Sequence, residues 1–153
     1  SSCMWRLNME LQIFSGALNT SEIYHVWESR AIERNCGALS IFTGIVRGEN
    51  NITHLSFDIY LPLLQSWFDT WQMKAKAKQT TIYMAHSSGD VEIGKSSYMC
   101  GLISKNRQSV LSLYNDFIED FKANAPIWKY DVIDGKRIYA LHRSHEIKGA
   151  RLV

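Results

Sequence analysis

The sequence is poor in the residues that build disulfide scaffolds and metal centres. It has three cysteines, Cys3, Cys36 and Cys100, and no two of them show the Cys-x-x-Cys spacing. An odd count without that spacing argues against a disulfide framework and against a cysteine-built zinc site. The five histidines also lack the His-x-x-x-His spacing of metal-binding helices. We therefore expect no metal and no other cofactor.

Long apolar runs are absent as well. No window reaches the roughly 18 apolar residues that a membrane-spanning helix needs, and the first residues lack the apolar stretch of a signal peptide. With unpaired cysteines, this predicts a cytoplasmic protein that does not bind a membrane. Only two prolines occur, and no linker-like segment interrupts the chain. We expect residues 1–8 to form a flexible N-terminal segment and residues 9–153 to form one domain.

The chain also has no strong excess of one charge. It carries 17 Lys and Arg against 15 Asp and Glu, for a net charge of +2. This balance is unlike that of proteins that coat nucleic acid, so we expect no nucleic-acid partner. An anionic small molecule or an acidic protein tail remains compatible with it.

What the sequence has in abundance is apolar and aromatic side chains. The hydrophobic fraction is 46%, with 5 Trp, 7 Tyr and 6 Phe in 153 residues. A chain of this length and composition can bury one substantial core. Alternating apolar positions and turn residues predict strands at 9–14, 38–46, 52–60, 80–86, 96–104, 127–132 and 137–141. Helical spacing, caps and an early proline predict helices over 19–35, 62–78 and 108–122.

Turn residues predict how these strands connect. The stretch from Gly48 to Asn51 predicts a hairpin between strands 38–46 and 52–60, and the Asp134-Gly135 pair predicts another near the C-terminus. Residues 89–94 are expected to be a loop. Hairpins mixed with two to three helices predict an α+β domain with a mixed, mostly antiparallel sheet of α/β hammerhead type.

Two lysines flank a short connection in the segment Phe121-Lys122-Ala-Asn-Ala-Pro126-Ile-Trp128-Lys129. Pro126 ends the helix, and Phe121 and Trp128 can wall a site with apolar surface. Desolvation lowers the pKa of a lysine and makes it useful in proton transfer. From the spacing alone, two solvated surface lysines are the more common interpretation.

This segment and two others resemble the large subunit of molybdopterin synthase. Ala125-Pro126-Ile127-Trp128-Lys129, with Lys122 before it, is similar to one motif of that family. The stretch from Gly37 to Arg47, with Phe42-Thr-Gly44 inside it, is similar to a second, and Ser104-Lys-Asn106-Arg107 to a third. The resemblance extends from about Met9 to Arg143, and the three motifs occur in the family's order and at its intervals.

The resemblance implies an activity and a set of partners. The family transfers sulfur from the C-terminal Gly-Gly thiocarboxylate of a small ubiquitin-like subunit to cyclic pyranopterin monophosphate, which gives the dithiolene of molybdopterin. The large subunits form a homodimer, with one small subunit docked at each end. By residue, it implies that Lys122 and Lys129 are catalytic. It implies that Arg47, Phe42, Asn106, Arg107 and Arg143 bind substrate.

The implied residues suit the implied ligands. The phosphate and the thiocarboxylate are both anions, so a cationic pocket can hold them. Arg47 and Arg107 can each give forked hydrogen bonds to phosphate oxygens. A lysine can move protons while the carbon–sulfur bonds form.

The position of Arg107 predicts how the subunits share the site. If Arg107 begins the helix that ends at Lys122, fifteen residues separate the two by roughly 22 Å. Two side chains so far apart cannot serve one small pocket within a chain. We therefore predict that Arg107 reaches into the pocket of a second copy across a two-fold axis.

The sequence also departs from the family's pattern. Asn106 replaces a family histidine and cannot act as an acid or base. An arginine is missing from His86-Ser87-Ser88-Gly89, Ile59 replaces a histidine, and a late arginine falls on His142 or Arg143, of which charge favours Arg143. We expect His86 to be a strand-end hydrogen bonder and Cys100 to be core packing.

These departures leave other functions open. The chain could be a catalytically impaired binding module that docks the ubiquitin-like subunit, which would suit Asn106 and the missing arginine. A nucleotide- or RNA-binding α+β domain is a third interpretation. The balanced charge and the lack of a basic, aromatic-studded strand speak against it.

Overall fold

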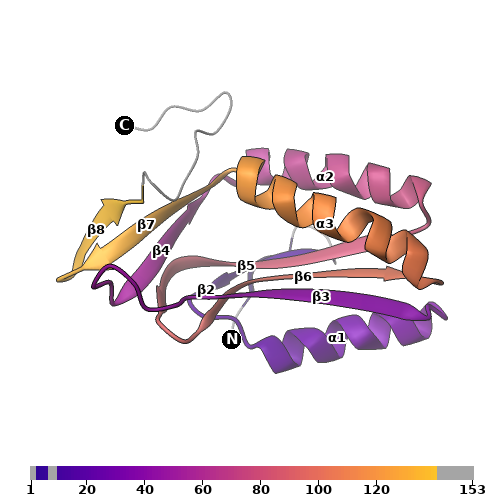
Figure 1. Ribbon diagram of the computed structural model, residues 1–153, viewed down its shortest axis with the longest axis horizontal. Helices are drawn as coiled ribbons and strands as arrows, with labels where there is room; N and C mark the ends of the chain where they lie inside the picture. The colour runs from indigo at the N-terminus through magenta and orange to yellow at the C-terminus, as the bar shows by residue number, and fades with distance from the viewer. Residues whose placement is uncertain (1–2, 7–9, 141–153) are drawn as a thin grey trace.

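The computed structural model describes residues 3–6 and 10–140, which form three helices and an eight-stranded sheet (Figure 1). The helices are α1 (Thr20–Glu33), α2 (Leu61–Ala77) and α3 (Arg107–Asn124). The strands are β1 (Cys3–Arg6), β2 (Leu11–Ser15), β3 (Ala38–Ile45), β4 (His54–Ile59), β5 (Thr81–Glu92), β6 (Ser96–Ser104), β7 (Ile127–Ile133) and β8 (Lys136–Tyr139). The predicted α+β class is confirmed. Residues 1–8 were expected to lie outside the fold, but the structure pairs Cys3–Arg6 with β2.

The sheet is organised around β5, which changes partner along its length. Its first half pairs with β6 on one side and, in parallel, with β2 on the other. From Gly89 onward it pairs with β4, which continues through β7 to β8. All other strand pairs in the described residues are antiparallel. The molecule therefore has a main sheet and a smaller splayed extension, which Figure 1 shows as β4, β7 and β8 at one end.

Two of the predicted connections are wrong. Strands β3 and β4 do not form a hairpin, because β3 pairs with β6 and β4 pairs with β5 and β7. The turn at Asn50 and Asn51 exists, with positive φ at both, but it carries the chain past the β5–β6 turn. There, Val46 N–H donates to Lys95 C=O and Ile93 N–H donates to Thr53 C=O. The β5–β6 hairpin thus lies between the two strands that local turn signals paired.

The expected loop over 89–94 is also wrong for most of its length. Strand β5 continues to Glu92, because β4 supplies a new partner where the pairing with β6 stops at His86. Gly89, at φ +79°, lies at this change of partner, and only a short turn at Gly94 remains.

Asn19 caps α1 as predicted, and its side chain accepts a hydrogen bond from Glu22 N–H. Asn106, which was predicted to bind substrate and not to cap a helix, caps α3 and accepts from Ser109 N–H. Pro62 lies in the first turn of α2, where its missing N–H costs nothing. No helix in the described part of the chain is long and apolar enough to cross a bilayer.

Two apolar cores lie on opposite faces of the main sheet. Helices α2 and α3 cover one face and α1 covers the other (Figure 1). Strand β5 alternates between them, because Ile82 and Met84 face the α2–α3 core while Tyr83 and Ala85 face α1. Gly101 permits the close packing of α1, since a Cβ there would lie 2.7 Å from the ring of Trp27. Cys100 and Trp71 are buried in the α2–α3 core as expected, and Trp67 is half-buried and packs against that core.

A carboxylate joins the two helices above the main sheet. The indole N–H groups of Trp67 and Trp71 on α2 donate to Asp120 Oδ2 on α3, at 2.8 and 2.7 Å. Asn124 donates to the other oxygen at 2.6 Å. Desolvation acts to raise the pKa of Asp120, but the hydrogen bonds from Trp71, Asn124 and Trp67 outweigh it, and the pKa falls below its usual value. The ionised carboxylate therefore fixes the end of α3 that carries Lys122.

The change Asp120→Asn should destabilise the fold by about 1.5–3 kcal/mol at pH 7, the range for hydrogen bonds to a charged group. A depressed carboxyl pKa contributes stability above the unfolded-state pKa and loses it as pH falls through the folded pKa. The difference between wild type and variant should therefore shrink toward pH 3 in urea denaturation. Asp116→Asn, an exposed position one turn earlier on α3, is the matched control. If Asp120→Asn lost the same unfolding free energy at pH 3 as at pH 7, the ionised form of Asp120 would not be what stabilises the contact between α2 and α3.

Candidate active site

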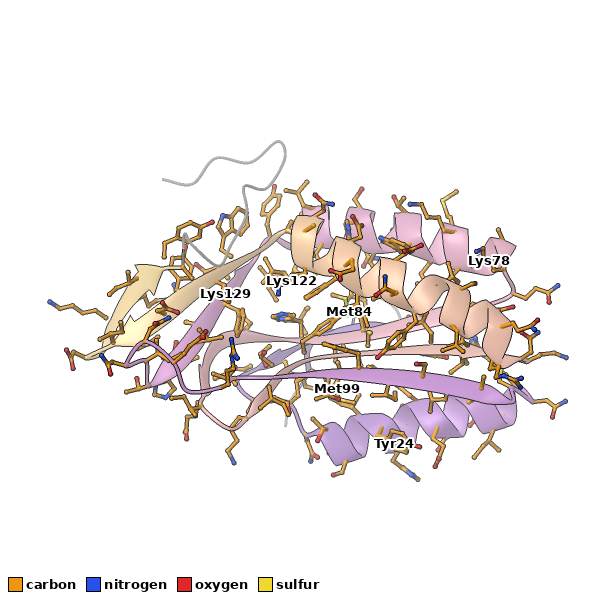
Figure 2. The ribbon with its side chains drawn as sticks, in the orientation of Figure 1. Tyr24, Lys78, Met84, Met99, Lys122 and Lys129 are labelled. Atoms are coloured by element: carbon orange, nitrogen blue, oxygen red, sulfur yellow. The ribbon has the colours of Figure 1, made fainter. Side chains whose placement is uncertain are left out.

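A cavity of about 860 Å³ opens between the C-terminal end of α3, strand β3 and the smaller sheet extension. Its lining comes from separate stretches of the chain, and it includes four of the predicted site residues: Phe42, Arg47, Lys122 and Lys129. Figure 2 labels Lys122, at the end of α3, and Lys129, on β7, and both residues line this cavity. Cations from three separate stretches of the chain thus line one cavity.

Lys122 lies in the last turn of α3, where the helix dipole favours a cation. The residue is exposed, and no ion pair or hydrogen bond engages its ammonium group among the described residues. Pro126 is buried just beyond the helix and redirects the chain into β7. The amine is therefore free to meet an anion that enters the cavity.

Lys129 reaches the same cavity from strand β7. It pairs with Phe57 of β4, and because paired residues lie on the same face of a sheet, both side chains line the cavity. Trp128, the next residue back, lies on the opposite face, since successive side chains alternate along a strand. The expectation that Trp128 walls the site is therefore wrong, whereas the expectation for Phe121 is confirmed.

Arg47 stands at the rim of the cavity, just after β3. Its Nη2 lies 3.3 Å from Glu49 Oε2, and its side chain is 83% exposed. A surface pair of this kind is weak, because water screens it. The guanidinium can therefore exchange Glu49 for a phosphate that offers two oxygens.

Aromatic rings form the floor of the cavity. Tyr98 and Phe121 stack with ring centroids 3.9 Å apart and planes 10° from parallel. The buried ring of His86 lies against both, at 5.8 Å from each, and meets Phe57 edge-on at 4.9 Å. Phe42 completes the wall at 5.9 Å from Tyr98. A flat heterocycle has apolar surface to lie against while its charged groups meet the cations.

Burial controls the ionisation of the groups around this floor. Desolvation lowers the pKa of His86 to about 4, and the backbone hydrogen bond to Ser87 only partly opposes it. Burial raises the pKa of the Tyr98 hydroxyl well above its usual value, and that of the Cys100 thiol to about 12. All three groups are therefore neutral near pH 7. A thiolate nucleophile from Cys100 is excluded.

The remaining predicted site residues do not reach this cavity within one chain. Asn106 and Arg107 lie at the opposite end of α3 from Lys122, and Asn106 is occupied in capping that helix. Arg107 is exposed and absent from the cavity lining. Arg143, with the alternative His142, falls outside the described residues.

Several lining residues were not predicted from the sequence, among them Tyr98, Phe57 and Glu119, and His86 was expected only to form a hydrogen bond. The sequence around Tyr98 in β6 and around Phe57 in β4 contains no distinctive motif. The rings of Tyr98, Phe57 and His86 come together because β5 changes its pairing from β6 to β4 near His86. His86 does form the expected hydrogen bond, from Nδ1 to Ser87 C=O at 2.8 Å. Among the described residues, no three His, Cys, Asp or Glu side chains are grouped to hold a metal ion.

Comparisons with known proteins give a consistent result. The family model "MoaE protein" matches residues 15–124. A "molybdopterin synthase catalytic subunit" from Helicobacter pylori strain 26695 is 54% identical over 143 residues, which cover 94% of this chain and 99% of the relative. A second subunit of that name, from Helicobacter pylori strain J99, is 44% identical over the same share of both chains.

Comparison with solved structures gives the same family as the sequence comparisons. A chain from the "protein-protein complex of subunit 1 and 2 of molybdopterin-converting factor" of Helicobacter pylori 26695 superposes with a TM-score of 0.88 at 54% identity, covering 92% of this chain and 96% of that one. Molybdopterin synthase from Staphylococcus aureus, at 20% identity, shares the fold with a TM-score of 0.70 over 83% of this chain and 93% of that one. By the matched family model and by identity over nearly its whole length, this chain belongs to the MoaE protein family.

Proposed function

We propose that this protein is the catalytic subunit of a molybdopterin synthase, a sulfurtransferase of molybdenum cofactor biosynthesis. One observation carries the proposal: Arg47, Lys122 and Lys129 come from three separate stretches of the chain and line a single cavity with an aromatic floor. Such a cavity suits a flat heterocycle that bears a phosphate. The relatives named as catalytic subunits, and the related chain that forms a complex with a second subunit, support the same activity.

The substrate is cyclic pyranopterin monophosphate, and the sulfur donor is the C-terminal Gly-Gly thiocarboxylate of a ubiquitin-like small subunit. The nucleophilic sulfur comes with that partner, so the cavity needs no thiolate of its own, in keeping with the neutral Cys100. Arg47 binds phosphate. Lys122 and Lys129 hold the incoming thioacid and move protons as each carbon–sulfur bond forms. Water then hydrolyses the acyl–sulfur bond, which leaves the sulfur on the pterin and releases the small subunit's C-terminus as a carboxylate.

The large subunits form a homodimer, and Arg107 completes the pocket of the partner subunit together with Asn106. The length of α3 supports this arrangement, because Arg107 and Lys122 lie at its opposite ends, roughly 22 Å apart by helical rise. Arg143 is proposed as a further phosphate contact. The cytoplasm remains the proposed compartment, in keeping with the free thiols Cys36 and Cys100.

The experiment that tests the activity is reconstitution from purified parts. The protein, the thiocarboxylated small subunit and cyclic pyranopterin monophosphate are mixed, and the product is oxidised to a fluorescent pterin. We expect molybdopterin to form in proportion to the thiocarboxylate supplied, two sulfurs per product. A small subunit that ends in an ordinary carboxylate is the control.

The same experiment distinguishes the enzyme from the second candidate function, a binding module that docks the small subunit without catalysis. Asn106 stands where the family has a histidine, and a protein that docks the small subunit without chemistry would bind it and release no product. If the two subunits co-purify but form no fluorescent pterin, the protein is a binding module and the proposal that it is an enzyme is wrong. Product formation eliminates the binding module.

A further inference from the structure

His86 lies on the cavity floor, and neither the binding of an anionic ligand nor proton transfer gives this titratable side chain a role. Its side chain is 3% exposed, and the ring is in contact with Phe57, Tyr98 and Phe121. Rings on several sides hold the imidazole in one orientation. A polar group so enclosed is costly unless its hydrogen bonds are made.

The backbone determines the tautomer of this ring. Nδ1 lies 2.8 Å from Ser87 C=O, and a carbonyl oxygen only accepts, so Nδ1 carries the proton. Nε2 of the neutral ring is then an acceptor. No hydrogen bond to Nε2 occurs among the described residues.

The open side of the ring is the cavity. Among the described residues, the hydroxyls of Tyr98 and Ser87 are wholly enclosed and have no hydrogen-bond partner, whereas His86 Nε2 is not one of the enclosed atoms that lack a partner. His86 is also part of the cavity lining. The unpaired acceptor therefore belongs to a surface that a ligand can reach.

The chemistry of this acceptor differs from that of the rest of the cavity. Arg47, Lys122 and Lys129 only donate hydrogen bonds and select anions. A neutral nitrogen acceptor selects the opposite feature, an N–H group, and it excludes groups that present only lone pairs. A reduced pterin carries N–H donors on its ring and its amino group, whereas a bare phosphate carries none.

We propose that His86 is a positioning residue that accepts a hydrogen bond from an N–H of the pterin ring through Nε2, and so distinguishes the heterocycle from other phosphate-bearing molecules. The inference rests on the proposed function and adds a contact to the uncharged part of the same substrate. The ring stays neutral throughout turnover. Its contribution is to the placement of the substrate against the Tyr98–Phe121 stack.

The test compares two amides that mimic the two nitrogens of the ring. In His86→Gln, an amide oxygen can lie near the position of Nε2, while His86→Asn reaches only as far as Nδ1. Calorimetry measures the affinity for cyclic pyranopterin monophosphate and, separately, for inorganic phosphate, in the wild type and in both variants. We expect His86→Asn to weaken pterin binding and raise KM about tenfold, the loss of roughly one hydrogen bond, with phosphate affinity unchanged. His86→Gln should recover most of the loss.

Each outcome has a definite meaning. Equal losses for both ligands in both variants would show a merely structural role, and unchanged KM in His86→Asn would show no contact; either overturns the inference. If the wild type itself neither binds the pterin nor forms product, the proposed function fails instead. A third variant, His86→Phe, preserves the aromatic packing without an acceptor, so a pterin-selective loss there supports the inference even if the amides fold poorly.

Discussion

Replacing Lys122 by alanine should lower the rate of molybdopterin formation by at least a hundredfold, the scale of a lost proton-transfer group. The amine lies at the cavity, has no ion pair among the described residues to satisfy, and follows the stacked ring of Phe121 directly. Its removal leaves no other group at that position. The measurement is single-turnover formation of the fluorescent pterin.

Two further variants separate the contribution of the positive charge of Lys122 from its contribution to proton transfer. Lys122→Arg retains the positive charge but cannot release a proton, so it should preserve substrate binding while product formation stays low. Lys76→Ala removes one exposed lysine from the last turn of α2 and is the matched control for net charge. Folding should be unaffected in all three, because Lys122 is exposed. Undiminished turnover in Lys122→Ala would remove this residue from the mechanism.

Two inactive variants should restore each other when they share one dimer. If Arg107 serves the partner subunit's pocket, a dimer of one Arg107→Ala chain and one Lys122→Ala chain has one complete pocket and one pocket that lacks both groups. Isolated through two different affinity tags, this mixed dimer should show about half of the wild-type rate, whereas each variant alone is nearly inactive. The reason is the length of α3, which separates the two residues within a chain.

A reciprocal dimer makes the result unambiguous. One wild-type chain paired with one Arg107→Ala/Lys122→Ala chain should be almost inactive, because the wild-type pocket then lacks the partner's arginine. If each pocket were built from a single chain, this dimer would retain half of the rate and the first mixed dimer would retain none. The two arrangements thus give opposite patterns.

Much of the helical structure was predictable from local signals. The cap residue Asn19, Pro62 in the first turn of α2, and Pro126 after α3 act within a few residues of their own position. Alternation predicted the strands for the same reason. Two of the three motifs also indicated Phe42, Arg47, Lys122 and Lys129, which line one cavity, because a motif carries the chemistry of its family along with its spacing.

The pairing of strands was not predictable in this way. Turn residues indicated a β3–β4 hairpin, yet each of these strands pairs with one arm of the β5–β6 hairpin, which comes later in the chain. Local signals determine where the chain turns. The pairing partner of a strand depends instead on which other strands in the folded sheet have an unpaired edge beside it. Trp128 shows the same limit, because the face of a strand residue depends on the register with its neighbour.

By itself, the sequence determined the class of the fold, most helix ends and the cationic character of the site, since all of these depend on residues close together in the chain. Only the tertiary structure decided the floor of the cavity, where His86, Tyr98 and Phe121 meet from β5, β6 and α3. The same packing decided that His86 is neutral there, because desolvation acts only when distant segments enclose the ring.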